Sequence, residues 1–597
     1  MEKSNSPVSV PCGIAAAVCS VFLAAVTLCF FRAPLFLLLP AAAGLFLLLR
    51  QISQVHNRRL FVCNAVFSLL LAISFIAGNK ANLQSGQTMS SFLHNDLLPL
   101  AALGAVFFIC FSCMSDFIGR HPVHLCRKRR RLSPGKMWLA STLVLFFSWI
   151  PCLFVFYPGN ISGDSVACIV RALGKVPLSN QQPLLYILLI RPVLQFAFAI
   201  GRDINFGAAL FLTLQTAVMA VVIGYFFCWL TQKGAAPWIQ ILCMAYFVLN
   251  PVFSIYAVTM WKDILFSAFT LLYLLQLYNI LQSGGEKLQS LGYLVGFVLL
   301  NILLCFLRNN GYYLVFVTLV ILAVLYRKYW KRVLPAFLAV LILVPVIQGP
   351  GYKAANVAAS PFAESVGIPL QQIGYTVAND GAVTVEQKAF LNQILPLDTM
   401  KKSYRPYIVN PIKFNSAFNN NFLESHKGEF IKVWAQMLRP NWKKYVKAYL
   451  METVGYWHIG TANWIALYGA VDPEMCRMVG IVQPDAVSFA WSRGAVKNSL
   501  DCLQKQIPVL SLILSIGFLF WAVLYAAFQM IIQKRRKKLL LLVPLLLLWL
   551  TLMVATPTFC EFRYMFAFSV AFPLVVLLSF PVEQREKMNS PRHLKTE

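Results

Sequence analysis

The sequence is poor in charged residues, and acidic residues are the scarcer kind. Only 12% of its 597 residues are Asp, Glu, Lys or Arg, about half of the roughly 25% used by soluble globular proteins. This deficit excludes an ordinary water-exposed surface. Lys and Arg outnumber Asp and Glu by 51 to 22, giving a net charge of +29. Because the densest basic runs lie between apolar segments, this excess favours a membrane topology over nucleic-acid binding.

The sequence also lacks the motifs of several large enzyme and transporter classes. It contains no P-loop, dinucleotide fingerprint, zinc-protease helix or nucleophile elbow. We therefore do not expect a pump with its own nucleotide site. No internal repeat is evident, so an inverted-repeat transporter receives no support.

Apolar runs long enough to cross a bilayer recur along most of the chain, whose mean hydropathy is +0.68. We predict an all-α polytopic membrane protein with about fourteen transmembrane helices, because lipid offers no partner for unpaired backbone groups. The expected spans are 11–31, 34–49, 60–78, 96–117, 138–156, 206–230, 238–258, 264–281, 288–307, 312–326, 333–348, 508–532, 539–555 and 564–580.

The basic loops predict which way the spans run. The runs at 127–131, 327–332 and 534–538 should be cytoplasmic. An even number of spans separates them only if 184–200 does not cross. Arg191 and Pro192 interrupt that segment, so we expect a broken, interfacial or re-entrant helix there. Both termini then lie in the cytoplasm.

Four regions follow from this topology. Residues 1–137 form an N-terminal four-span extension, and 138–348 form a transmembrane core with acidic loops on its outer face. Residues 349–506 are rich in Trp, Tyr, Asn and Pro with charges of both signs, which predicts a folded, α-rich extracytoplasmic domain. Residues 507–597 form a C-terminal three-span segment and a cytoplasmic tail.

Two aspartates lie on outer loops next to spans. Asp164 follows Tyr157 and a Pro- and Gly-containing turn, and Asp263 follows Lys262 between two spans. Each could be only a helix N-cap or first-turn acid. Together they could instead bind a divalent cation or share base and orienting roles in a reaction.

Three cations, Lys262, Arg308 and Arg563, are expected at the same membrane depth. They could be snorkelling toward headgroups. Converging on two acids, they would instead suit a lipid phosphate or diphosphate. Glu561 could simply pair with a nearby cation.

His458 stands among aromatic residues and has no metal-ligand spacing. It and Trp457 could belong to the packed interior or an aromatic belt, or they could stack on a sugar ring.

The order of these features resembles that of the GT-C superfamily of integral-membrane glycosyltransferases, and within it a largely uncharacterised bacterial family. The resemblance covers about residues 138–580, with Gln182 at a position where His or Lys is common. It is carried by the Tyr157–Asp164 loop, Gln182 to Tyr186, Lys262-Asp263, Arg308 to Gly311, Pro369 to Ile373, Thr453 to Trp457 and Glu561 to Tyr564.

The resemblance implies transfer of a sugar from a polyprenyl-phosphate donor to a glycan, lipid or polymer acceptor outside a bacterial plasma membrane. It implies that Asp164 is the base or orients the acceptor, and that Asp263 assists it or binds a cation. Lys262, Arg308 and Arg563 would hold the donor phosphate. The residues expected to contact substrate are Tyr157, Asn160, Gln182, Asn309, Trp457, His458, Glu561 and Tyr564. A flippase or exporter, or an assembly scaffold for lipid-linked glycans, remains the alternative.

Overall fold

The computed structural model describes most of the chain. The described residues are 10–53, 55, 57–82, 89–125, 132–465, 473–482, 487–505, 507–556 and 558–584. The predicted cytoplasmic location of the two termini and of the basic run at 127–131 concerns residues outside these ranges.

The regular secondary structure of the described chain is helical apart from two three-residue strands, and every predicted apolar run forms helix. The N-terminal helices are α1 (Val10–Phe30), α2 (Leu38–Ile52), α3 (Arg58–Ala81) and α4 (Leu97–Arg120). The central ones are α5 (Pro134–Trp149), α6 (Pro151–Val155), α7 (Gly163–Ala172), α8 (Leu184–Ala199), α9 (Ile204–Lys233), α10 (Pro237–Leu249), α11 (Pro251–Ala257), α12 (Lys262–Gln282), α13 (Leu291–Leu307), α14 (Gly311–Leu325) and α15 (Trp330–Val346).

The remaining helices form a long polar region and the C-terminal segment. The polar region holds α16 (Tyr352–Ala354), α17 (Gly367–Ala378), α18 (Val385–Ile394), α19 (Leu397–Ser403), α20 (Asn410–Lys413), α21 (Asn420–Ser425), α22 (Lys427–Thr453), α23 (Pro473–Met478) and α24 (Val487–Lys505). The C-terminal segment holds α25 (Pro508–Leu512), α26 (Ile516–Ile532), α27 (Val543–Ala555) and α28 (Phe566–Ser579).

By length and apolar composition, eight helical segments of the described chain could cross a membrane, and nine could if α10 and α11 form one bent span. Six shorter apolar helices of 10–17 residues accompany them. The chain therefore has the character of a polytopic α-helical membrane protein.

Two of the predicted spans are broken within their length. Helices α10 and α11 meet at 58° around Asn250, whose side chain caps the second helix. In the segment 508–532, Ser515 caps α26 by accepting from the Phe518 amide. Proline and side-chain caps end one helix and start the next, a local effect that apolar composition does not register.

The break predicted in 184–200 is wrong. Helix α8 continues through Pro192. The neighbouring Arg191 has hydrogen-bond partners. Its Nε donates to the Ala172 carbonyl at 3.0 Å and its Nη2 to the Arg171 carbonyl at 3.4 Å. These carbonyls lie at the C-terminus of α7, where a cation is favoured. The interfacial position of α8 stays a prediction.

Two large hydrophobic clusters contain most of the buried apolar residues. The larger one runs through the helical body and includes Tyr456, Ile465 and Cys476. The smaller one contains buried residues between Ala363 and Val454, joined by Ala81 and Met89. The compact unit within the polar region therefore ends near α22, and the chain after it packs back onto the helical body.

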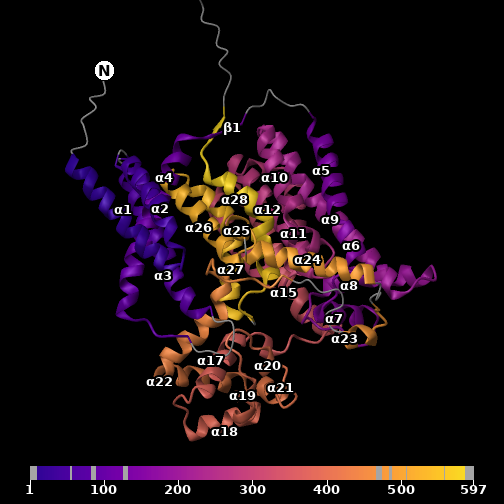
Figure 1. The fold of residues 1–597 in the computed structure, drawn as a ribbon. Coiled ribbons are helices and arrows are strands. Elements are labelled where there is room, and N and C mark those ends of the chain that lie inside the picture. The colour runs from indigo at the N-terminus through magenta and orange to yellow at the C-terminus, as the bar shows by residue number, and fades with distance from the viewer. Residues whose placement is uncertain are drawn as a thin grey trace, which may run out of the picture.

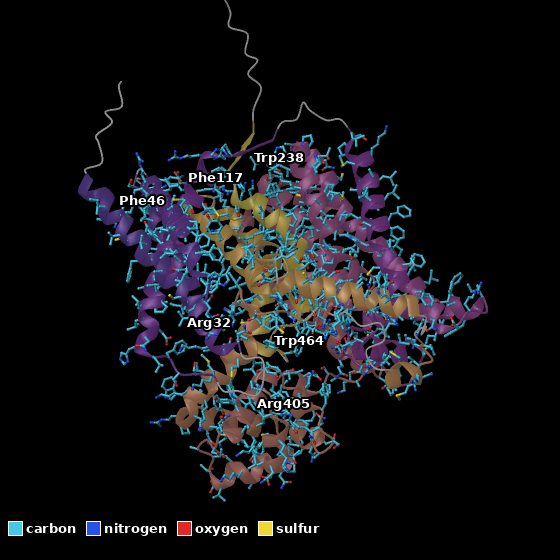
Figure 2. The ribbon with its side chains drawn as sticks, viewed as in Figure 1. Arg32, Phe46, Phe117, Trp238, Arg405 and Trp464 are labelled. Atoms are coloured by element: carbon cyan, nitrogen blue, oxygen red, sulfur yellow. The ribbon has the colours of Figure 1, made fainter. Side chains whose placement is uncertain are left out.

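The smaller unit lies at one end of the body. Figure 1 shows α17 to α22 at the bottom of the view and strand β1 (Val123–Leu125) at the top. Strand β1 pairs in parallel with β2 (Val582–Gln584), so the chain flanking the basic run meets the chain's C-terminal part there. Figure 2 shows Phe117 and Trp238 near that end, and Trp464 where the body meets the unit carrying Arg405.

Candidate functional site

The two loops that carry the predicted aspartates are joined by their backbones. Asn160 and Thr259 form a parallel bridge, in which the Met260 amide donates to the Asn160 carbonyl at 3.0 Å. The Asn160 side chain also donates to Thr259 Oγ1 at 3.2 Å. Asp164 and Asp263, 99 positions apart (263 − 164), are thereby held on adjacent loops.

A glycine shapes the first of these loops. Gly159 adopts φ +134°, and a Cβ there would lie 1.9 Å from Leu212 Cδ1. Only glycine takes this backbone conformation readily. Both the backbone conformation and the lack of space therefore require glycine at position 159 of this turn.

Asp164 lies in the first turn of α7 and carries an ion pair. Its Oδ2 is 2.6 Å from Arg563 Nη1, and its Oδ1 accepts from Gln182 Nε2 at 3.1 Å. Burial acts to raise the pKa of Asp164, but the charges of Arg563 and Lys262 outweigh burial and lower the pKa to about 2. Asp164 is therefore an ionised carboxylate at neutral pH.

Asp263 lies in the first turn of α12, and its side chain is only 1% exposed. Its Oδ1 is 3.3 Å from Arg308 Nη1, yet neither carboxylate oxygen accepts a hydrogen bond from the described residues. Arg308 is better provided, because it also donates to the Tyr564 carbonyl at 3.2 Å and lies against the rings of Phe266 and Tyr564. Among the described residues, Arg308 is the only one that forms an ion pair with Asp263, and the charge of Arg563 acts on Asp263 from a longer distance.

Arg563 contacts more members of this group than Asp164 alone. Its Cζ lies 4.4 Å from the Trp261 ring centroid, and its Nε is 3.6 Å from Glu561 Oε1. Trp261 in turn donates from Nε1 to Ser162 Oγ at 2.6 Å. One guanidinium from the start of the last helix thus contacts both aspartate-bearing loops, through Asp164 and Trp261.

Glu561 differs from Asp164 in its electrostatic surroundings. Burial raises its pKa, Arg563 acts to lower it, and the charges of Asp164 and Asp263 raise it further. The predicted pairing of Glu561 with a cation is confirmed by its contact with Arg563. The cluster therefore holds one carboxylate with a low pKa beside one with a raised pKa.

Gln182 connects Asp164 to Lys262. Its amide nitrogen donates to Asp164, and its Oε1 accepts from Lys262 Nζ at 2.5 Å. A glutamine can bridge in this way because it presents a donor and an acceptor at once. The site thus contains Asp164, Asp263, Glu561, Lys262, Arg308, Arg563, Gln182 and Tyr564.

Sequence reasoning missed several neighbours of this site. Lys413 of α20 contributes to the low pKa of Asp164, and it pairs with Glu364 at 2.6 Å. Glu364 also accepts from Gln181 Nε2 at 3.4 Å. No local pattern distinguishes Lys413 from the other lysines of the polar region, whereas Trp261 adjoins the singled-out Lys262 and could have been included.

Four residues predicted to contact substrate, Tyr157, Asn309, Trp457 and His458, interact with residues outside this cluster. Asn309 Nδ2 donates to the Asn180 carbonyl at 3.1 Å, and burial followed by the charge of Asp203 raises the pKa of Tyr157. Trp457 Nε1 donates to Thr453 Oγ1 at 3.1 Å. Their roles in binding substrate stay predictions.

His458 is the fourth of these residues. It is 1% exposed, its Nδ1 is 3.1 Å from Thr461 Oγ1, and its ring centroid is 5.7 Å from that of Phe75 in α3. Burial lowers its pKa to about 4. These contacts agree with the packing interpretation, in which a neutral imidazole packs against α3 of the N-terminal helices.

A divalent cation at the aspartates stays a prediction. Among the described residues, no group of three or more His, Cys, Asp or Glu side chains is arranged to hold a metal ion. Asp164 and Asp263 are each paired with an arginine instead.

Comparison with known proteins gives the family of the chain. The model of a family of unknown function, DUF6020, matches residues 174–593, and the chain belongs to this family. The match includes Gln182, Asp263, Arg308 and Arg563, whereas Asp164 and the four N-terminal helices precede it. No curated protein and no solved structure matches the chain.

Proposed function

We propose that this member of a family of unknown function is a membrane glycosyltransferase. It moves a sugar from a polyprenyl-phosphate-linked donor to a glycan, lipid or polymer acceptor on the outer face of a bacterial plasma membrane. The single observation that carries the proposal is the meeting of four chain-distant segments, which contain Asp164, Lys262 with Asp263, Arg308, and Glu561 with Arg563, at one end of the helical body. They gather three acids and three cations where spans begin or end.

The cations suit the phosphate of a lipid-linked donor. The phosphate would lie against Arg563, with Arg308 and Lys262 nearby, while the isoprenoid chain stays among apolar helices. Guanidinium groups bind phosphate in bidentate fashion. As the sugar leaves, negative charge develops on the phosphate oxygen, and fixed cations stabilise that charge.

The acids suit activation of the acceptor. The acceptor hydroxyl oxygen would form a bond to the anomeric carbon while the bond from that carbon to the phosphate oxygen breaks. The electron pair of the broken bond goes to the phosphate, and the hydroxyl proton goes to Asp164. A donor phosphate competes with Asp164 for Arg563, which would raise the pKa of Asp164 toward that of an effective base. Asp263 would assist by holding Arg308.

The proposal includes a topology in which both termini are cytoplasmic and residues 349–506 are outside. Supporting it, the β1–β2 pair lies at the end of the body opposite to α17 to α22. The basic run after β1 then falls on the cytoplasmic side, as the positive-inside rule requires.

The test is sugar transfer by purified protein in liposomes that contain a radiolabelled polyprenyl-phosphate sugar and an envelope-glycan acceptor. Asp164→Asn should lower transfer at least about 100-fold, the scale of a lost general base. Asp380→Asn is the matched control, because Asp380 is 84% exposed and pairs with Lys401 away from the cluster. It should retain wild-type transfer.

Other outcomes identify the alternatives. Movement of intact donor between leaflets without transfer would identify a flippase or exporter. Binding of glycan without turnover or movement, unaffected by Asp164→Asn, would identify an assembly scaffold.

A further inference from the structure

A charged cavity lies away from the acidic cluster, which is the group formed by Asp164, Asp263 and Glu561 with their cations. It has a volume of about 610 Å³ and is lined by the five consecutive basic residues 534–538 together with Tyr278, Leu281, Gln282 and Leu541. The side chains of Lys534, Arg536 and Lys537 are exposed at the edge of this cavity, whereas Arg535 and Lys538 are half-buried in it. The basic run folds over the C-terminal end of α12.

The cavity and the acidic cluster lie at opposite ends of the same helices. Helix α12 begins at Lys262 and Asp263, ends at Gln282 and is 21 residues long. At 1.5 Å per residue this is about 30 Å, the thickness of a bilayer's hydrocarbon core. Helix α28 follows Arg563 at one end, and its last carbonyls contact Arg535 at the other.

The positive charge in this cavity is poorly compensated. Arg535 donates from Nη2 to the carbonyls of Leu578 and Ser579, but its Nε and Nη1 are buried and donate to no described residue. Lys538 and Lys233 both lie over the Tyr278 ring, at 5.6 and 5.3 Å from its centroid. Within the described chain, no carboxylate forms an ion pair with residues 534–538.

Burial and the crowding of positive charge lower the pKa of Lys538. Burial contributes most to this shift, and repulsion from Arg535 follows. A bound anion would relieve both the crowding of like charges and the unfilled hydrogen-bonding capacity of the guanidinium.

We propose that this cavity binds a phosphate group at the face opposite to the acidic cluster. Its ligand is a phosphate ester or diphosphate, either the headgroup of a lipid in that leaflet or a free phosphate compound. Several donors converge on one small space, as phosphate recognition requires, and basic pockets between transmembrane helices suit anionic headgroups. Tyr278, Leu281 and Leu541 offer an apolar wall to the carbon chain next to a lipid phosphate. The proposal does not depend on glycosyl transfer.

The chain offers a matched control for this idea. The loop at 327–332 is also strongly basic, and Arg327, Lys328 and Lys331 are exposed and do not line the cavity. The triple variant R536Q/K537Q/K538Q removes one arginine and two lysines from the cavity. The variant R327Q/K328Q/K331Q removes the same set of charges elsewhere. Arg535 is left intact because its bonds to α28 are structural.

The lipid arm of the test measures how much phosphatidylglycerol the purified full-length protein retains from mixed micelles with phosphatidylcholine, by native mass spectrometry. The free-phosphate arm measures the shift in Tm caused by inorganic diphosphate in nanodiscs of phosphatidylcholine alone. In whichever arm responds, the cavity variant should weaken binding at least tenfold and the control variant less than twofold. A response in either arm supports the proposal and identifies the source of the phosphate.

A measurement on the wild-type protein tests the proposal even if the cavity variant misfolds. Acetylation of Lys537 and Lys538 should slow at least threefold when phosphatidylglycerol or diphosphate is present, while acetylation of Lys328 should not change. The proposal is overturned if neither ligand protects these lysines. It is also overturned if both triple variants lose ligand equally, since the effect would then be general surface charge.

Discussion

Breaking the ion pair between Asp263 and Arg308 should destabilise the protein far more when the arginine is removed than when the aspartate is removed. Asp263 is 1% exposed and forms its only ion pair in the described chain with Arg308, whereas Arg308 also has the Tyr564 carbonyl and two aromatic rings. Removing one partner of a buried pair costs about 3–5 kcal/mol when the remaining charge is left alone. Arg308→Met should therefore lower the free energy of unfolding by about that amount.

The reverse substitution should be milder. In Asp263→Asn the guanidinium keeps its carbonyl and its rings, so we expect a loss of about 1–2 kcal/mol. The double variant removes the isolated carboxylate and should be about 2 kcal/mol more stable than the sum of the two single losses predicts. Such coupling is typical of side chains in direct contact.

The assay is reversible unfolding in mixed micelles, with the free energy of unfolding extrapolated to zero denaturing detergent. Lys401→Met serves as control, because the Lys401–Asp380 pair is shorter, at 2.8 Å, but exposed. It should leave the free energy of unfolding unchanged. The reasoning fails if Arg308→Met is no worse than Asp263→Asn, or if the losses in the double variant simply add.

Three further outcomes are expected. The folded-state pKa of Asp164, about 2, lies below its unfolded value, so its ion pair with Arg563 stabilises the protein above about pH 4. That contribution is lost as the pH falls to about 2, and screening of a side chain that is 38% exposed leaves about 1 kcal/mol of it. The difference in unfolding free energy between wild type and Asp164→Asn across this range measures it, and a constant difference would refute it. His458 has a folded pKa of about 4, below its unfolded value of about 6.5. It therefore favours the folded state above pH 6.5, and about 3 kcal/mol is lost between pH 6.5 and 4. His458→Phe should flatten the unfolding profile in that window, and an unchanged profile would count against a buried neutral imidazole. In Gly78→Ala the new Cβ would lie 2.1 Å from His458 Cδ2, so we expect a loss of about 1–3 kcal/mol in thermal or detergent unfolding. Adding His458→Ala should recover part of it, and no recovery would mean that the clash lies elsewhere.

The amino-acid order was sufficient to predict where helices form. Every predicted apolar run is helical, because in lipid the backbone must bond within its own segment. Composition did not predict the break at Asn250 or the continuity of α8 through Pro192. These depend on caps and on carbonyl partners such as those of Arg191, which are contributed by particular side chains or by another helix.

The same division holds for the candidate site. Position next to spans was enough to single out Asp164, Asp263, Lys262, Arg308 and Arg563, since charges near lipid are costly without a purpose. The sequence alone could not assign Arg563 to Asp164 and Arg308 to Asp263, because these pairings join loops that are distant along the chain. The bridge between Asn160 and Thr259 and the start of the last helix bring them together. Only the tertiary structure shows that Lys413 acts on Asp164 and that His458 contacts Thr461 and Phe75 outside this cluster. Packing, and not spacing along the chain, determines which side chains meet.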